Sequence, residues 1–354
     1  MAEQTSNIKE LVRQIYFPPI SKDTNWSFSN FIGHDNIRYY SYARHALYDA
    51  LKLCELKKGD KVLIPNFICR EVLSSINKVG AVAVYYDVTP ALQVKSLNNL
   101  PAAKAIVIVN YFGFPANLDS IREYCLYHAP IVIEDNSHGF LSKDNDNKPL
   151  GTRTDIGIFS LRKSMPVING AALVINDSVL KSRLNKQLNY VSDTTEFKYE
   201  CFKKKIKMLV PSKRYSLIIK LVKIKQRIRR LLKGTPVIIS SLESEYNLPY
   251  KPNPHIDLKK YIKTILVDEE IERRRSLYKY LTDYLGQEVE LIVTKLDGNV
   301  VPYVFPFHCN EIDKIKIKLK KINLSCYKWP ELPEQIQSSC PDYYKNVWMV
   351  PFLW

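Results

Sequence analysis

A lysine and a carboxylate in the middle of the chain have the types and spacing that cofactor chemistry requires. Lys163 follows a short apolar run, and it lies seven residues before Gly170. Another apolar run, about thirty residues upstream, ends in Glu134 and Asp135. Side chains placed just beyond the carboxyl ends of buried parallel strands meet at one edge of a sheet. We therefore expect Lys163 and Asp135 to face the same site.

Such a pair fits the chemistry of pyridoxal phosphate (PLP). A lysine amine holds this cofactor as a Schiff base, and a carboxylate keeps its pyridinium nitrogen protonated. Simpler interpretations stay open, because most lysines are solvated surface charges and Asp135 could cap a following helix. The position of Lys163 after a predicted buried strand favours the cofactor interpretation.

The elements that must position these residues alternate along the chain. Strands are predicted at residues 62–65, 81–86, 105–109, 131–133, 156–159 and 171–175, and helices at 43–53, 70–77 and 118–127. Several of the strands are continuous apolar runs, which is typical of a parallel sheet covered on both faces. The predicted fold class is therefore α/β, with a mainly parallel sheet in a three-layer domain.

Changes in the composition and pattern of the sequence along the chain predict three units. Residues 1–40 are interpreted as an N-terminal arm, and residues 41–245 as a large cofactor-binding domain that includes a basic segment at 202–233. Residues 246–354 are interpreted as a smaller C-terminal α+β domain that begins with a Pro- and Asn-rich linker. Within it we expect a long helix, a strand at 300–305, a helix at 312–320 and a turn at Trp329 and Pro330.

The composition excludes several classes of protein. The hydrophobic share of 46% and the charged share of 25% are those of an ordinary soluble protein. No apolar stretch is long enough to span a bilayer, and the first residues lack the apolar core of a secretory signal. The seven cysteines form no C-x-x-C pair, which favours reduced thiols in the cytoplasm over disulfides or zinc. The six histidines lack metal-ligand spacing, so no metal site is predicted.

The net charge of +16 comes mostly from residues 202–233, which hold thirteen Lys/Arg and no Asp/Glu. An apolar stripe at helical spacing runs through this segment: Leu217, Leu221, Ile224, Ile228 and Leu231. Such a helix suits the headgroup region of an anionic membrane. Two alternatives remain: packing of the stripe on the protein's own core or a dimer partner, and nucleic-acid binding. The latter is disfavoured because no nucleic-acid-binding module is recognisable.

Further motifs occur in a specific order. They are Arg44-His-Ala-Leu47, Lys58-Gly-Asp-Lys-Val-Leu-Ile-Pro65, Tyr111-Phe-Gly-Phe-Pro115, Val132-Ile-Glu-Asp135 with His138, and Phe159-Ser160 through Lys163 to Gly170. On these residues the chain resembles the DegT–StrS family of nucleotide-sugar aminotransferases. The resemblance implies the fold-type I architecture of PLP enzymes, with a three-layer large domain and a smaller α+β domain.

The resemblance implies roles for three of these residues. Lys163 matches the Schiff-base lysine, which also moves a proton during transamination. Asp135 is expected at the pyridine nitrogen, and His138 where the family has Gln or His near the 3′-oxygen of the cofactor. A core histidine bonded to backbone groups is the alternative for His138. Because relatives that act as dehydratases have histidine in place of the lysine, Lys163 favours transamination.

Other family positions carry different residues here. The turn that binds the cofactor phosphate has Arg44 and His45 in place of small residues, and Ser160 is the expected side-chain contact. Ser160 lies closer to Lys163 than is usual in the family. The position of the aromatic that stacks on the cofactor ring is Cys69, and Phe67 or Tyr111 are alternatives for this role. Arg44 could also point outward, and the family's partner-subunit motif, Asn-x-Arg with the stretch after it, is not recognisable.

The function implied by the resemblance is PLP-dependent transfer of an amino group, often from glutamate, to a keto-sugar that is usually nucleotide-linked. Such enzymes serve the synthesis of cell-surface polysaccharides, including lipopolysaccharide, or of antibiotic sugars. A cytoplasmic homodimer is expected, with contact to the inner membrane face through residues 202–233. Two alternatives stay open: a PLP enzyme acting on a lipid-linked or non-sugar carbonyl, and a non-catalytic, membrane-associated family member.

Overall fold

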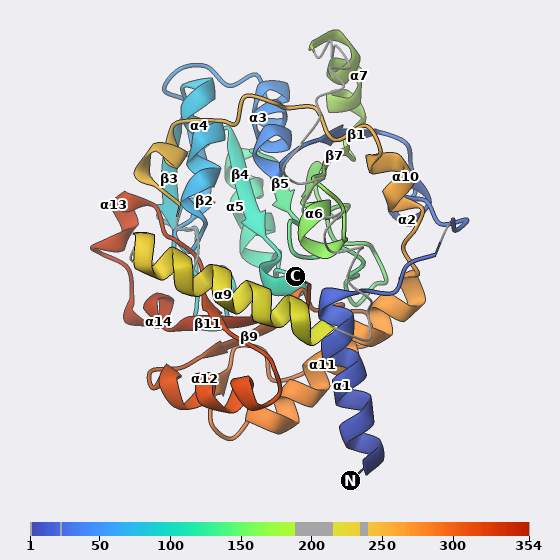
Figure 1. Ribbon diagram of the computed structural model, residues 1–354. Coiled ribbons are helices and arrows are strands. Elements are labelled where there is room, and N and C mark those ends of the chain that lie inside the picture. Colours follow the sequence, from blue (N-terminus) through green and yellow to red (C-terminus); the bar gives the residue numbers. More distant parts are fainter. Residues whose placement is uncertain (1, 22, 188–214, 234–239, 354) are drawn as a thin grey trace.

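The computed structural model describes residues 2–21, 23–187, 215–233 and 240–353. A seven-stranded sheet forms the centre of the molecule, in the order β1-β7-β6-β5-β4-β2-β3 (Figure 1). Its strands are β1 (Ile37–Tyr40), β2 (Lys61–Pro65), β3 (Val82–Tyr86), β4 (Ala105–Val109), β5 (Ile131–Asp135), β6 (Ile156–Phe159) and β7 (Ala171–Ile175). Strands β3, β2, β4, β5 and β6 run parallel, and β7 is antiparallel to both β6 and β1. The predicted α/β class with a mainly parallel sheet is confirmed.

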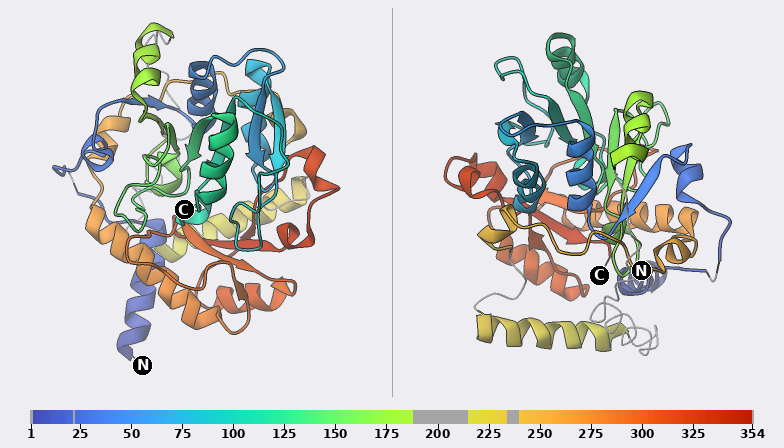
Figure 2. Two further views of the ribbon diagram at one scale, coloured as in Figure 1. Left: turned by 180° about the vertical axis from the view of Figure 1, so that it is seen from behind. Right: turned by 90° about the horizontal axis from the view of Figure 1, so that it is seen from above.

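Helices cover both faces of this sheet. Its main covering helices are α3 (Ala43–Leu53), α4 (Leu73–Val79) and α5 (Asp119–His128). Because parallel crossovers are right-handed, the connections from β2 to β3 and from β4 to β5, which run in opposite directions across the sheet, place α4 and α5 on opposite faces. Figure 2 shows α5 in front when the molecule is seen from behind, whereas α3 and α4 are in front in Figure 1. All residues of β4, β6 and β7 are consequently buried.

A second, smaller sheet has the order β10-β11-β9-β8 and is antiparallel. Its strands are β8 (Glu290–Leu291), β9 (Val304–His308), β10 (Tyr327–Lys328) and β11 (Val347–Pro351). The strand predicted at residues 300–305 therefore begins later, at Val304, after Tyr303, whose N–H donates to the carbonyl of Phe112 outside the sheet. The other helices are α1 (Ala2–Tyr16), α2 (Phe28–Ile32), α6 (Leu161–Ser164), α7 (Ser178–Gln187), α9 (Tyr215–Lys233), α10 (Leu258–Ile262), α11 (Val267–Leu285), α12 (Ile312–Lys321), α13 (Glu334–Gln337) and α14 (Asp342–Lys345), with short 3-10 helices at Arg70–Val72, Tyr111–Gly113 and Leu242–Glu245.

The end of the expected N-terminal arm contributes to the large sheet. Residues 37–40 form edge strand β1, in which Tyr40 pairs with Ala171 of β7. We therefore propose that the large unit begins at β1 rather than at residue 41, with the smaller unit following at 246–354. Helix α1 packs against α11 and α9. In the described part of the chain, no helix combines the length and apolar composition needed to cross a bilayer.

A buried ionic cluster in α11 ties the large and small units together. Glu270 accepts hydrogen bonds from the guanidinium groups of both Arg273 and Arg274. Arg274 also donates to the carbonyl oxygen of Ser164 at 2.8 Å, and Arg273 donates to that of Phe352 at 2.8 Å. All of these residues are buried, and buried polar groups need hydrogen-bond partners, so breaking one of these bonds would leave a group unsatisfied. The cluster consequently fixes the end of α6, the short helix that carries Lys163.

Candidate active site

Lys163 lies at the carboxyl edge of the large sheet. Strand β6 ends at Phe159, Ser160 occupies the N-cap position, and α6 then presents Lys163. The amide of Lys163 donates to the carbonyl of Ser160 at 3.0 Å, which fixes the short turn. Its amine nitrogen Nζ lies 3.0 Å from Nε2 of His138, deep in the protein, although part of the side chain remains exposed. Sequence reasoning placed these two residues in one site, and the structure joins them directly.

The surroundings of His138 determine which ring nitrogen carries its proton. The backbone N–H of Phe112 donates to Nδ1 at 3.3 Å, so the neutral ring carries its hydrogen on Nε2. That Nε2–H then points at Lys163 Nζ, which can accept it only as a neutral amine. The rings of Phe112 and Tyr303 lie parallel to the imidazole, with centroids 5.7 and 4.7 Å away. His138 is thus held in one orientation for contact with an uncharged lysine.

The electrostatics favour the same protonation states. Burial lowers the pKa of Lys163, and the charge of Arg162 adds to this effect, whereas the carboxylate of Asp135 opposes it. Burial, followed by the charge of Lys163, lowers the pKa of His138 well below its usual range. A lowered lysine pKa makes the amine available as a nucleophile at lower pH.

Strand β5 directs two neighbouring carboxylates to opposite faces of the sheet. Consecutive residues of a strand point to opposite faces, so Glu134 and Asp135 face opposite ways. Glu134 is fully buried, whereas Asp135 is partly exposed. Oδ1 of Asp135 accepts the backbone N–H of Ser137 at 2.9 Å, which orients the carboxylate at the strand end. Asp135 therefore remains available to a ligand, and Glu134 serves the fold.

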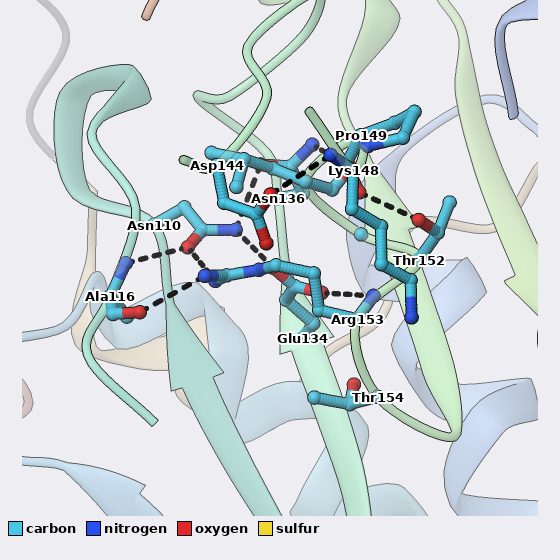
Figure 3. Close-up of polar contacts among 12 residues, drawn as sticks. Asn110, Ala116, Glu134, Asn136, Asp144, Lys148, Pro149, Thr152, Arg153 and Thr154 are labelled. Atoms are coloured by element: carbon cyan, nitrogen blue, oxygen red, sulfur yellow. Dashed lines mark hydrogen bonds and ion pairs between the residues drawn. The ribbon is translucent and has the colours of Figure 1, made fainter. Parts of the chain in front are cut away.

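Glu134 belongs to a buried polar network that holds the ends of β4 and β5 together (Figure 3). Nε of Arg153 donates to Glu134 at 2.7 Å, and another guanidinium nitrogen donates to Oδ1 of Asn110 at 2.8 Å. The Asn110 amide nitrogen donates in turn to Glu134 at 2.8 Å and to Asn136 at 3.0 Å. Because Glu134 and Asn136 flank Asp135 in the chain, this network fixes the position of the Asp135 backbone from the far side of the sheet.

The three candidates for the ring-stacking position differ in exposure. Phe67 is 0% exposed and Tyr111 is 5% exposed. The Tyr111 hydroxyl donates a hydrogen bond to the carbonyl oxygen of Phe67. Cys69 is partly exposed. Burial raises the pKa of the Cys69 thiol to about 12, so it is protonated at neutral pH. Trp329 is a further partly exposed aromatic, with its ring centroid 5.1 Å from that of His138.

The expected phosphate end of the site lies at the start of α3. Tyr42 is its N-cap residue, and the guanidiniums of Arg44 and Arg162 lie 5.5 and 5.2 Å from its ring centroid. Burial, with the charge of Arg162 contributing, lowers the pKa of Arg44. A helix start flanked by two guanidiniums attracts an anion. His45 is different, because its Nδ1 pairs with the Ser41 hydroxyl and its Nε2 with the Pro249 carbonyl.

Sequence reasoning missed several residues of this site. Arg162 adjoins Lys163 and could have been considered on that ground alone. Tyr303 and Trp329 gave no signal of a role in the site, since they reach it from distant segments. Arg153, which supports Asp135 from behind, gave none either, because only the fold buries its side chain against Glu134. Together, a neutral amine, an available carboxylate and paired guanidiniums at a helix start form a donor set that fits PLP. Within the described residues, no cluster of His, Cys, Asp or Glu could hold a metal ion.

The fold and this donor set together define a fold-type I PLP enzyme architecture. A family model for the DegT/DnrJ/EryC1/StrS aminotransferases matches residues 21–294. The chain therefore belongs to the DegT/DnrJ/EryC1/StrS aminotransferase family. Aminotransferases of this family depend on PLP.

Individual relatives match shorter stretches. A UDP-N-acetyl-3-dehydro-alpha-D-glucosamine 3-aminotransferase of Acidithiobacillus ferrooxidans is 30% identical over 155 residues, 42% of this chain and 42% of the relative. An L-glutamine:2-deoxy-scyllo-inosose aminotransferase of Streptomyces kanamyceticus is 30% identical over 144 residues, 38% of this chain and 33% of that relative. The matches thus span less than half the length of these curated relatives.

Similarity in structure extends over almost the whole chain. The sugar aminotransferase CalS13 from Micromonospora echinospora superposes with a TM-score of 0.62 at 16% identity, covering 98% of this chain and 91% of that chain. At this level of identity, the likeness concerns the fold. It confirms that the large sheet and the smaller unit together form the architecture expected from the sequence.

Proposed function

We propose that this protein is a PLP-dependent aminotransferase that converts a nucleotide-linked keto-sugar into an amino sugar. The observation that carries the proposal is the contact of 3.0 Å between Lys163 Nζ and His138 Nε2, beside the available carboxylate of Asp135. Bound PLP would supply an electron sink that stabilises negative charge on the carbon next to the transferred nitrogen. The similarity to two aminotransferases whose substrates are a UDP-linked sugar and an inosose supports a cyclic polyol-like substrate.

Each residue of the site has a proposed role that its geometry supports. Lys163 is proposed as the catalytic residue: its Nζ would hold the cofactor and, as a neutral amine, would move a proton. Asp135 would hold the proton on the pyridine nitrogen. His138 would keep Lys163 neutral and contact the 3′-oxygen, since its Nε2–H is directed toward the site.

The phosphate contacts are proposed for Arg44, Ser160 and, beyond the sequence expectation, Arg162. The side chain of His45 already has two partners, so we propose that it holds the turn before α3 rather than donating to the phosphate. Cys69 is proposed at the ring face, because it is partly exposed whereas Phe67 and Tyr111 are buried.

The amino donor, assembly and location are also proposals. Glutamate is the proposed amino donor, and the proposed oligomeric state is a homodimer. The family resemblance of the sequence supports both. The proposed location is the cytoplasm at the inner membrane face, where cell-surface glycans such as lipopolysaccharide are assembled. The basic segment supports this location, because its cations would be attracted to anionic headgroups.

The proposal is tested with the purified full chain, first for cofactor binding and then for product. Wild type with added PLP should develop a visible absorbance band that Lys163→Ala lacks, while the circular dichroism of both proteins stays the same. Nucleotide-linked keto-sugars with glutamate should then give an amino sugar detectable by mass spectrometry. A folded wild-type protein without a lysine-dependent band would overturn the proposal and favour a non-catalytic role. A band without amination of any keto-sugar would favour a lipid-linked or non-sugar carbonyl substrate.

A further inference from the structure

Helix α9 exposes an apolar stripe along its whole length. The exposed fractions of its residues are 43% for Leu217, 55% for Leu221, 54% for Ile224, 51% for Ile228 and 80% for Leu231. These residues follow the spacing of one helix face. A helix of 19 residues is about 28 Å long, so the stripe forms one extended surface rather than scattered single side chains. Extended apolar surfaces of this kind mark sites of interaction.

The protein's own body is contacted by the opposite face of α9. Ile219 is 5% exposed and belongs to the main core, and Val222 packs against the same core. Nε2 of Gln226 donates to the Tyr327 hydroxyl at 3.3 Å. At 100° per residue, these three positions lie roughly opposite the stripe. The possibility that the stripe covers the protein's own core is therefore wrong for the described residues.

Cations flank the stripe on both sides. Helix α9 holds seven Lys/Arg and no acidic residue. Lys220 and Arg227 lie beside one edge of the stripe and Lys225 beside the other, and all three are exposed. An apolar face bordered by cations is the layout of a helix that lies in the plane of an anionic lipid surface.

The position of α9 on the molecule suits a flat partner. In the right-hand view of Figure 2, α9 runs along one side of the molecule as the outermost of the helices and strands drawn there. A planar surface can therefore reach the full stripe. A second copy of α9 is a poorer partner, because its cations would be brought against those of the first copy.

We propose that α9 docks the protein on membranes containing anionic phospholipids, with the stripe at the boundary between headgroups and acyl chains. Lys220, Lys225 and Arg227 would lie at the level of the lipid phosphates. The helix would lie on the surface rather than span it. This inference is independent of the proposed catalytic function, since α9 contributes none of the residues proposed to bind PLP.

The test is co-sedimentation of the full chain with vesicles of phosphatidylcholine, with or without phosphatidylglycerol. We expect binding to the mixed vesicles that is at least roughly tenfold stronger than to phosphatidylcholine alone, and that weakens with added salt. The double variant Leu221→Glu/Ile228→Glu should lose at least roughly tenfold in binding, because charge on the apolar face opposes insertion. The charge variant Lys220→Gln/Arg227→Gln should lose the preference for phosphatidylglycerol.

The matched control is Leu126→Glu, a similar change at an exposed leucine on α5, which should bind like wild type. Unchanged circular dichroism and PLP absorbance would show that each variant is folded, which separates this test from that of the catalytic proposal. The proposal is overturned if wild type does not bind the mixed vesicles, or if the stripe variants bind as well as wild type. Loss of a dimer in the stripe variants, measured by light scattering without any vesicle binding in wild type, would instead assign the stripe to a second copy of the chain.

Discussion

The Lys163 site and helix α9 use lysine and apolar surface in opposite ways. At the site, a lysine is drawn deep into the protein, its pKa is lowered by burial, and its amine is satisfied by His138. On α9, Lys220, Lys223 and Lys225 are exposed, and the leucines and isoleucines of the stripe are exposed beside them. Each region departs from the usual rule that apolar groups are inside and charges outside. The departure at the site serves chemistry, whereas the departure on α9 suits contact with another surface.

Removing Lys163 tests most directly whether the lysine of the site differs from the exposed lysines. Lys163→Ala should lower aminotransferase activity by about 10⁴-fold or more, because both the attachment point and the proton-transfer group are lost. The measurement is steady-state turnover with the substrate found in the screen. The matched control is Lys279→Ala, which removes an exposed lysine of α11 and should leave turnover unchanged. Equal losses in the two variants would contradict the special role of Lys163.

The buried network behind Asp135 predicts the next largest effect. Arg153→Met should lower the free energy of unfolding by about 3–5 kcal/mol, because it leaves the carboxylate of Glu134 buried without its ionic partner. The matched control is Arg122→Met, which breaks a surface pair with Asp119 whose side chains are 73% and 76% exposed. That change should cost less than about 1 kcal/mol. Urea denaturation measures both, and similar values for the two variants would contradict the structural role of the network.

His138 separates the effect of ring packing from that of the hydrogen bond to Lys163. His138→Phe keeps a flat ring between its aromatic neighbours but removes the Nε2–H donor. We expect turnover to fall about tenfold, the equivalent of one hydrogen bond of about 1.4 kcal/mol. His138→Asn, which retains a polar side chain but loses the stacked ring, should differ from this variant in stability. Full activity in His138→Phe would contradict a role for the contact with Lys163.

The pH dependence of cofactor attachment tests the protonation state of Lys163. Because burial lowers its pKa, the amine loses its proton at a lower pH than an ordinary lysine. The rate of PLP attachment should therefore rise as pH increases through this lowered pKa and then level off below the pH at which free lysine titrates. In His138→Phe the rise should move to higher pH, since a donor to the neutral amine is lost. Stopped-flow absorbance measures the profile, and a rise at the pH of free lysine would contradict the account.

The smallest effect is expected on the exposed stripe of α9. Ile228→Gln should change the free energy of unfolding by less than about 0.5 kcal/mol, because the side chain is already in solvent. Leu51→Ala, in the core on α3, should cost about 2–5 kcal/mol. A large loss of stability in Ile228→Gln would mean that the stripe is covered within the protein.

Much of the large unit could be predicted because most of its strands are visible in the local sequence pattern. The continuous apolar runs of β4 and β7 match the prediction in position, and helix α3 matches it at both ends. Strand β1 was missed, since its sequence Ile-Arg-Tyr-Tyr has no clear pattern and its partner β7 lies more than 130 residues away. Strand β11 was missed for the same reason, because its pairing with β9 is set by distant contacts.

The residues of the site likewise include some that the sequence could predict and others that it could not. Lys163 and Asp135 could be proposed from the sequence because each lies at the carboxyl end of a strand, and the ends of parallel strands converge. His138 could be proposed only from the family resemblance. Arg153 could not be assigned, because an arginine is ordinarily an exposed residue and only the fold buries its side chain against Glu134. Tyr303 comes from the other unit and stacks on His138, a contact that no local pattern reveals. The apolar stripe and the cations around it can be seen in the sequence, but only the structure shows which face of α9 packs against the rest of the protein.

The most direct test of the central claim is to locate the lysine that holds PLP. The wild-type protein is incubated with PLP, reduced with borohydride, digested and mapped by mass spectrometry. The account predicts one dominant modified peptide, which contains Lys163, in spite of the many exposed lysines of the chain. Modification spread over the exposed lysines of α9, with none at Lys163, would contradict it.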